Sequence, residues 1–249
     1  MIIDKLNSAL NKTDIIFSKY VYIYSDFRAF LNQAGRNPEK KVLKFLNFFT
    51  DKGITCITPA FSYTTTGSFN LRKTSSRVGF LSNFILKNCK HERSNHPIFS
   101  YIALGKNKKI LKNLGKSAFG KKSLHETLIN KNCFFLHLNR PLIKGNTMMH
   151  HIEQKNQIKY RFEKTFRTKV FDRNNYMGTN FKAFVRKDMI NKYSLGTFKK
   201  AYKKLKNSKY INKKRIKDLD ITIYPYDIFY KDMDNLLKKN KKIFILGKN

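Results

Sequence analysis

Two kinds of hydrophobic spacing alternate along the first part of the chain. Residues 14–27 and 54–61 are rich in β-branched and aromatic side chains, which predicts strands, the first of them running into a loop. Residues 37–53, between them, carry apolar side chains at helical spacing, with Pro38 suited to a first helical turn and Gly53 to the stop. These three segments predict a β-α-β unit at the start of the fold.

The middle of the chain begins with a polar loop and continues in alternating elements. Residues 62–88 read as this loop followed by a helix, with Ser75 or Ser76 as a plausible N-cap. The remaining patterns predict strands at 96–105, 132–139 and 158–166, and helices at 124–130, 197–211 and 224–244. Strands separated by helices indicate an α/β layered fold, and no repeat or low-complexity linker divides residues 1–249, so we expect one domain.

The formal net charge of +36 suggests a nucleic acid or an anionic membrane surface as partner. An AT-rich coding sequence would produce the same abundance of lysine, asparagine and aromatic residues. The basic runs 106–116, 199–217 and 238–242 are separate and interrupted by apolar residues, as on solvated helix faces. Most of the 22 phenylalanines and 13 tyrosines lie in apolar runs and read as core. A basic nucleic-acid-binding or ribosomal protein stays open as an alternative, although we consider nucleic acid the weaker option.

Three widely spaced cysteines suggest neither a disulfide framework nor a metal knuckle. The first twelve residues carry an acid at Asp4 and lack an apolar signal region, and no run of 18 apolar residues occurs. We therefore expect a cytoplasmic protein without a membrane span.

The segment "NTMMHHIEQ" (146–154) carries the strongest candidate chemistry. On a helix, His150 and Glu153 project from the same face, so the carboxylate can hold one imidazole nitrogen and leave the other as a base. His151 points away from that face and reads as incidental. A casual surface pair is the competing interpretation, and a zinc site lacks ligands at the usual spacing, so we expect no metal.

Two further polar clusters have the composition of ligand-binding loops. "RSNHPIFS" (93–100) places His96 and Ser100 just before a strand, and "KSAFGKKS" (116–123) offers backbone N–H groups and lysines at a helix N-terminus. Each cluster is weak evidence alone, because a structural loop explains it equally well.

The order and spacing of these segments resemble the aminoglycoside 3-N-acetyltransferase family, whose members transfer an acyl group from coenzyme A to an amine of a sugar. "TSSRVGFLSNFIL", "RSNHPIFSYIALG", "SAFGKKS" and "NTMMHHIE" are similar to successive family elements, and the resemblance is most specific over 14–166. It implies a layered α/β/α fold with a central mixed sheet, and acetyl-CoA or another acyl-CoA as co-substrate.

The resemblance also implies residue roles. His150 matches the catalytic base and Glu153 its orienting partner. Residues of the acyl-CoA cleft correspond to Ser75, Ser76, Arg77, Gly79, Ser117, Gly120 and Ser123. Arg77 is suited to the pyrophosphate, and His96 and Ser100 to positioning.

Some positions depart from the family pattern and bear on the acceptor. His137 stands where the family has small residues, and Asp188 is the nearest counterpart of a further carboxylate. A strongly basic chain repels polycationic antibiotics and attracts anionic partners. We therefore expect an amino-sugar acceptor, with a nucleotide-linked sugar destined for a surface polysaccharide as one form of it, and with antibiotic acetylation and a catalytically dead binding module as alternatives.

Overall fold

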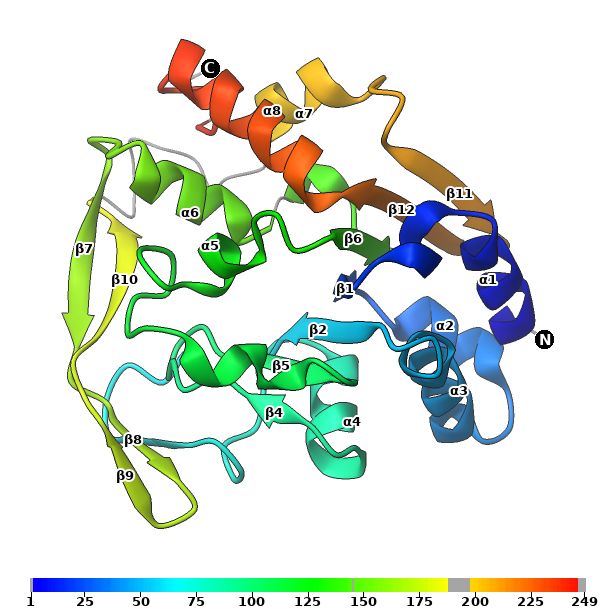
Figure 1. Cartoon of the computed structure of the whole chain (residues 1–249), viewed down its shortest axis with the longest axis horizontal. Helices are drawn as coiled ribbons and strands as arrows, with labels where there is room; N and C mark the ends of the chain where they lie inside the picture. Colours follow the sequence, from blue (N-terminus) through cyan, green and yellow to red (C-terminus); the bar gives the residue numbers. More distant parts are fainter. Residues whose placement is uncertain (1, 145, 188–197, 246–249) are drawn as a thin grey trace.

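A computed structural model describes residues 2–144, 146–187 and 198–245 of the chain. Its centre is a seven-stranded sheet with the order β11-β12-β6-β1-β2-β5-β4 (Figure 1). The strands are β1 (Tyr20–Ser25), β2 (Thr55–Pro59), β4 (Glu92–Arg93), β5 (Tyr101–Leu104), β6 (Cys133–Leu138), β11 (Asn212–Ile216) and β12 (Leu219–Pro225). β6, β1 and β2 run parallel, whereas the outer pairs are antiparallel. The sheet is therefore mixed.

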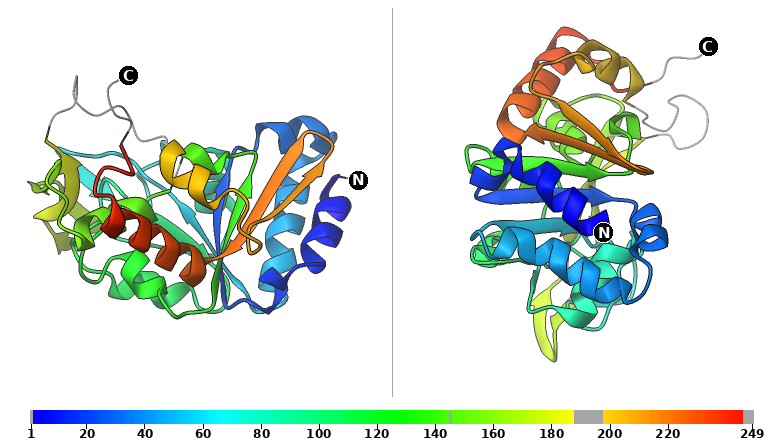
Figure 2. Two further views of the ribbon diagram at one scale, coloured as in Figure 1. Left: turned by 90° about the horizontal axis from the view of Figure 1, so that it is seen from above. Right: turned by 90° about the vertical axis from the view of Figure 1, so that its right-hand side faces the viewer.

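Helices cover both faces of this sheet. α1 (Ile2–Asn11), η1 (Asp14–Phe17), α2 (Arg28–Ala34), α3 (Pro38–Thr50) and α4 (Phe80–Asn88) contribute to one apolar cluster. η2 (Lys108–Asn113), α5 (Leu124–Leu128), η3 (Leu142–Lys144), α6 (Met148–Lys155), α7 (Lys199–Leu205) and α8 (Tyr226–Lys239) contribute to the other. Alternate β1 residues enter the two clusters, because successive strand side chains point to opposite faces. The left view of Figure 2 shows strands between the two helix layers, confirming the layered α/β/α prediction.

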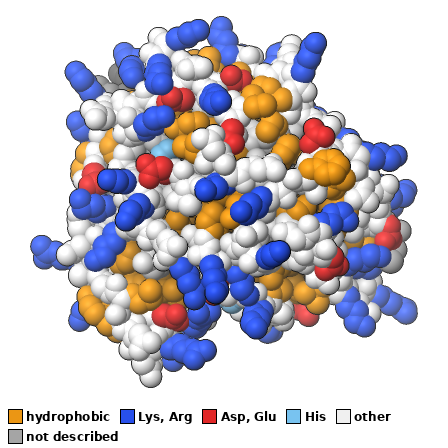
Figure 3. Space-filling view, viewed as in Figure 1, with side chains coloured by type: hydrophobic (Ala, Val, Ile, Leu, Met, Phe, Trp, Pro, Cys, Tyr) orange, Lys and Arg blue, Asp and Glu red, His pale blue; other side chains and the backbone are white. Residues whose placement is uncertain are grey.

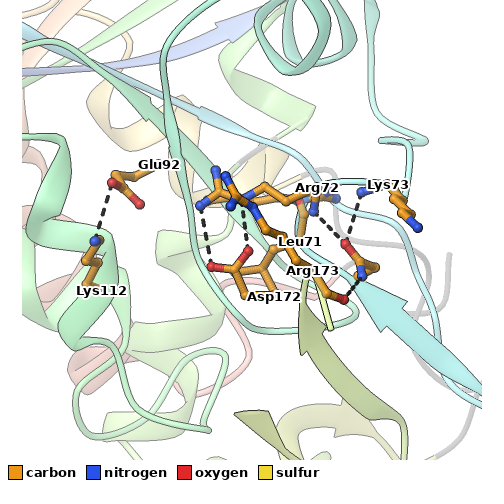
Figure 4. A network of polar contacts seen from close by, with 9 residues as sticks. Leu71, Arg72, Lys73, Glu92, Lys112, Asp172 and Arg173 are labelled. Carbon is orange, nitrogen blue, oxygen red and sulfur yellow. Dashed lines mark hydrogen bonds and ion pairs between the residues drawn. The ribbon is translucent and has the colours of Figure 1, made fainter. Parts of the chain in front are cut away.

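Two smaller sheets extend from one end of the molecule. β7 (Arg161–Phe166) pairs with β10 (Phe181–Arg186), and β3 (Ser68–Asn70) pairs with β8 (Lys169–Asp172), which continues into β9 (Asn175–Gly178). Arg72, just after β3, forms an ion pair of 2.9 Å with Asp172 of β8 (Figure 4). This contact joins the loop before α4 to the distant hairpin.

Two element predictions are corrected by local hydrogen bonds. The helix predicted after Ser75 or Ser76 begins only at Phe80, with Gly79 at the N-cap, because the backbone N–H of Arg77 donates to the Phe61 carbonyl instead. In the strand predicted at 96–105, only Tyr101–Leu104 is extended in the sheet. The preceding turn is closed by the backbone N–H groups of Ile98 and Phe99, which both donate to the His96 ring.

Charged side chains are spread widely over the surface. On the face shown in Figure 3, lysines and arginines are scattered among acidic and apolar side chains and do not form one continuous stripe. This distribution matches the interpretation of the basic runs as solvated faces. No helix within the described ranges is both long and apolar enough to span a membrane.

Candidate active site

Helix α6 is anchored by its apolar face and presents His150 on its other side. Met148, Met149 and Ile152 are buried, whereas the His150 side chain is 24% exposed. The His150 Nδ1 lies 2.8 Å from the Glu153 Oε2, so the two side chains meet across one helical turn as predicted. Since an ionised carboxylate only accepts, Nδ1 carries the proton and donates it to Glu153.

Two residues that the sequence analysis did not identify hold Glu153 in turn. The Tyr160 hydroxyl donates to Oε1 at 2.9 Å, and the Arg161 Nε lies 2.8 Å from Oε2 as an ion pair. Burial opposes ionisation of the carboxyl group, but the contacts from His150, Arg161 and Tyr160 outweigh it and lower the Glu153 pKa. A carboxylate that is 2% exposed is therefore ionised because it is fully surrounded by donors.

The imidazole of His150 is set up to accept a proton. Burial lowers its pKa below the ordinary value, while the hydrogen bond to Glu153 opposes part of this shift. The Phe119 ring packs edge-on against it at 5.2 Å. With Nδ1 donating to Glu153, Nε2 keeps its lone pair, and none of the residues that the structure describes forms a hydrogen bond to it. At neutral pH this is a neutral imidazole with a basic nitrogen available.

The loop 116–123 packs closely against the Gln154 side chain of α6. A Cβ on Gly120 would lie 2.7 Å from the Ser117 Oγ and 2.8 Å from the Gln154 Nε2, so a larger residue at this position would have to displace both side chains. Ser117 accepts a hydrogen bond from the Gly120 N–H, and Ser123 is the N-cap of α5. These contacts give the loop a structural role beside the cofactor role that the resemblance implies.

His151 also connects α6 to this loop. Its Nδ1–H donates to the Phe119 carbonyl at 2.6 Å, and its ring is buried. Phe119 thus contacts both histidines, through its ring and its carbonyl. His151 is therefore a structural residue of the site and not a side chain turned to solvent.

His96 and Ser100 lie in the interior and fix loops. The His96 Nε2–H donates to the Lys182 carbonyl at 3.0 Å, linking the loop to β10. The Ser100 hydroxyl donates to the Ala60 carbonyl at 2.7 Å and accepts from the Arg93 Nε at 3.2 Å. At 4% and 0% exposure these side chains do not face the solvent, which agrees with a positioning role.

Buried neutral histidines make the fold sensitive to acid. Burial lowers the pKa of His96 from 6.5 to about 4 and that of His137 to about 3. The unfolded chain therefore binds more protons below pH 6.5, and stability is expected to fall as pH drops from 6.5 toward 4, by a few kcal/mol in total. Urea unfolding across this range measures the loss. The double variant His96→Gln/His137→Gln should flatten the slope, whereas an unchanged slope would contradict the assignment.

A cavity of about 520 Å³ opens at the carboxyl ends of β1 and β2. Its lining includes Ser25 and Pro59, the last residues of these strands, together with Gly79 and the first residues of α4. β1 lies between β2 on one side and β6 on the other, so the order of the strands reverses at β1. Ligands of open α/β sheets bind at the carboxyl ends of the strands at such a point. Among the predicted cleft residues only Gly79 lines this cavity. Ser76 instead supports the loop by accepting a hydrogen bond from Ser82.

Buried hydroxyl groups connect this cavity to α6. Tyr24, in the cavity wall, lies 2.9 Å from the Thr147 Oγ1, and its hydroxyl accepts from the Thr147 N–H at 3.0 Å. Thr147 is also 2.7 Å from the His125 Nε2. The start of the helix that carries His150 is therefore tied to the sheet and to α5.

Residues 55–238 match the family model described as aminoglycoside 3-N-acetyltransferase. The match spans most of the chain and contains the His150–Glu153 pair. The chain belongs to this family. As a member, it is an acyl-CoA-dependent N-acetyltransferase.

Solved structures of the aminoglycoside 3-N-acetyltransferase fold superpose over nearly the whole chain. YokD from Bacillus subtilis is 14% identical with a TM-score of 0.75, covering 97% of this chain and 93% of its own. AAC-IIIb, solved with CoASH, is 15% identical with a TM-score of 0.77, covering 95% and 96%. AAC-VIa bound to sisomicin is 11% identical with a TM-score of 0.78, covering 95% and 97%. No curated protein matches by sequence.

In this acetyltransferase, His137, which departs from the family pattern, is held in the interior by hydrogen bonds. His137 is buried and lies 2.7 Å from the Tyr224 hydroxyl at its Nε2. Asp188, the nearest candidate for a further carboxylate, lies outside the described residues. Within the described ranges, no three histidine, cysteine or acidic side chains converge as metal ligands.

Proposed function

We propose that the protein acetylates the amine of an anionic amino sugar, with His150 as general base. The observation that carries this proposal is the buried His150–Glu153–Arg161 arrangement, in which the base is neutral and its partner ionised. An amino-sugar nitrogen is protonated near neutrality and must lose a proton before or during attack, which suits an imidazole.

The reaction follows from these positions. The amine nitrogen attacks the thioester carbonyl carbon, and its proton passes to the His150 Nε2. The C–S bond then breaks, and the coenzyme A thiolate takes the proton from the imidazolium. Glu153 stabilises the transient positive charge on the ring through its 2.8 Å hydrogen bond. The products are an amide and free coenzyme A.

The cavity at the ends of β1 and β2 is the proposed acyl-CoA cleft. Gly79 lines it directly, while Ser75, Ser76 and Arg77 lie in the loop leading to it. Ser117, Gly120 and Ser123 lie in the loop whose Phe119 contacts His150 and whose Gly120 packs on Gln154 of α6. The solved relative AAC-IIIb binds CoASH, which supports this class of donor.

The acidic side chains near the base are already engaged in contacts within the protein, and this supports an anionic acceptor. On α5, α6, β7 and β10, the carboxylates are Glu126, Glu153 and Glu163. Glu126 accepts the Lys122 N–H, and Glu163 pairs with Lys182 at 2.8 Å and accepts from Gln154. Each carboxylate on these elements is thus already engaged. A polycationic aminoglycoside would have to displace these contacts, whereas an anionic acceptor meets a net positive surface.

The test measures thiol release from acetyl-CoA with three acceptors that differ in net charge. We expect the highest kcat/KM for a nucleoside-diphosphate amino sugar, less for free glucosamine, and least for a polycationic aminoglycoside such as sisomicin. Because ions screen long-range attraction, kcat/KM for the nucleoside-diphosphate amino sugar should fall as the salt concentration rises. The opposite ranking would refute the anionic acceptor. Absence of both thiol release and acetyl-CoA binding would refute the whole proposal.

A further inference from the structure

Arg140 stands where two cavities adjoin. It follows β6 and lines both the 520 Å³ cavity and a second cavity of about 700 Å³. The second cavity is bounded by residues 139–143, by the β11–β12 hairpin and by Tyr202 of α7. A ligand too long for the first cavity would therefore pass the Arg140 side chain on entering the second.

The Arg140 guanidinium has no acidic partner in the described part of the chain. Its Nε is buried without a hydrogen-bond acceptor among those residues. By contrast, Arg72 forms an ion pair with Asp172, and Arg161 forms one with Glu153. Burying a charged donor without an acceptor costs free energy, so a ligand oxygen at this point would remove a penalty as well as form a bond.

The side chain is held in place before any ligand arrives. Its guanidinium lies over the Tyr24 ring at 5.6 Å, and the Tyr24 hydroxyl is fixed by Thr147. The Arg140 carbonyl accepts from the His137 Nδ1–H at 3.2 Å, and His137 is fixed in turn by Tyr224. A cation with restricted rotamers loses little entropy on binding an anion.

Further positive charge lines the second cavity. Lys213, Lys214 and Arg215 of β11 outnumber the acids Asp218 and Asp220. Arg215 is 3.6 Å from Asp220, while the Lys213 ammonium is held by the Lys206 carbonyl and lies 5.3 Å from the Tyr202 ring centre. The Lys214 ammonium donates to the Ala9 carbonyl of α1 at 3.0 Å. The lining as a whole therefore carries more cations than acids, including Arg140.

We propose that Arg140 binds a phosphate group of the ligand at the junction of the two cavities, with Lys213 and Lys214 adding attraction. The planar guanidinium presents parallel N–H donors that match two phosphate oxygens. The identity of the ligand rests on the proposed function, because the phosphate belongs either to coenzyme A or to a nucleotide-linked acceptor. Arg77 does not line either cavity, so Arg140 replaces it as the expected phosphate contact.

Calorimetric titration tests this site with four probes: coenzyme A, pantetheine, UDP and inorganic pyrophosphate. Arg140→Gln should lower the affinity for coenzyme A or for UDP about 10- to 100-fold and leave the affinity for pantetheine unchanged. Loss confined to coenzyme A assigns the phosphate to the donor, and loss confined to UDP assigns it to the acceptor. Arg72→Gln removes the same charge at the distant Asp172 pair and should change neither affinity.

Equal affinity of Arg140→Gln and the wild type for coenzyme A, UDP and pyrophosphate would overturn the inference, as would a loss produced by Arg77→Gln in its place. If Arg140→Gln fails to fold, Arg140→Lys serves, since it keeps the charge but loses the paired donors and should give an intermediate loss. Failure of the proposed function is distinguishable. Pyrophosphate binding that depends on Arg140, in a protein without thiol release, would support the site and reject the reaction.

Discussion

His150→Ala is expected to lower kcat/KM for acetyl transfer about 10²- to 10⁴-fold, the usual contribution of a positioned general base. The variant removes the imidazole whose Nδ1 is held by Glu153 and whose Nε2 is the proposed proton acceptor. Because the substitution truncates a side chain that is 24% exposed, the fold should be retained. Thiol release at saturating acetyl-CoA, followed across pH, measures the effect.

The pH profile separates a base from a structural residue. Burial lowers the His150 pKa, so the acid limb of the wild-type kcat/KM profile should fall at a pH below the ordinary histidine value of 6.5. The limb should disappear in His150→Ala, and the deficit should shrink at high pH, where the acceptor amine is already deprotonated. His91→Ala, a histidine in a loop outside the site, is the matched control and should leave the profile unchanged. Unchanged turnover in His150→Ala would place the base elsewhere.

Glu153→Gln is expected to cost both activity and stability. The variant is nearly isosteric, but it leaves the Arg161 guanidinium, which is 7% exposed, without its carboxylate. Removing one partner of a buried ion pair typically costs about 3–5 kcal/mol of unfolding free energy. The imidazolium formed in the reaction also loses its counter-charge, so kcat should fall at least tenfold, a change worth about 1.4 kcal/mol.

Two further variants distinguish a buried ion pair from an exposed one. Glu163→Gln breaks the exposed ion pair with Lys182 and should cost less than about 1 kcal/mol in urea unfolding. Adding Arg161→Met to Glu153→Gln removes the unpaired charge and should restore part of the stability without restoring kcat. If Glu153→Gln and Glu163→Gln were equally mild, the buried carboxylate would have to be neutral in the native protein.

Much of the fold was predictable because local patterns and tertiary contacts agree. The helix Pro38–Thr50 and the strands Thr55–Pro59 and Cys133–Leu138 coincide with predicted segments. Their apolar residues face the two core clusters, so burial reinforces the intrinsic preference. Loop hydrogen bonds decided the rest, as at Ser76, where a plausible cap supports the loop instead. The strands β9 and β11 were missed because they are mostly exposed and lack a clear alternation of apolar and polar residues. β12 does alternate, with Leu219, Ile221 and Ile223 buried, and this signal in the sequence was overlooked.

One part of the candidate site was predictable from the sequence, and another part was not. The spacing of His150 and Glu153 within one helix was sufficient to predict their contact, since α-helical geometry fixes it. Tyr160 lies in the turn before β7 and Arg161 begins this strand, and only the tertiary structure shows that both reach Glu153. A buried carboxylate on a helix needs donors, and "KYRFE" immediately downstream was the available signal for them.

The sequence by itself determined the family, the layered fold and the proposed catalytic pair, because these depend on short-range spacing and on the order of motifs. Tertiary structure alone decided which of the many cations can bind a ligand. Arg77 stood in a recognised motif, yet it is exposed and lines neither cavity, whereas Arg140 carried no motif, lines both cavities and has no acidic partner among the described residues. The physical reason is that charge neutralisation is a property of distances in space, and sequence neighbours of an arginine do not reveal which carboxylates will reach it.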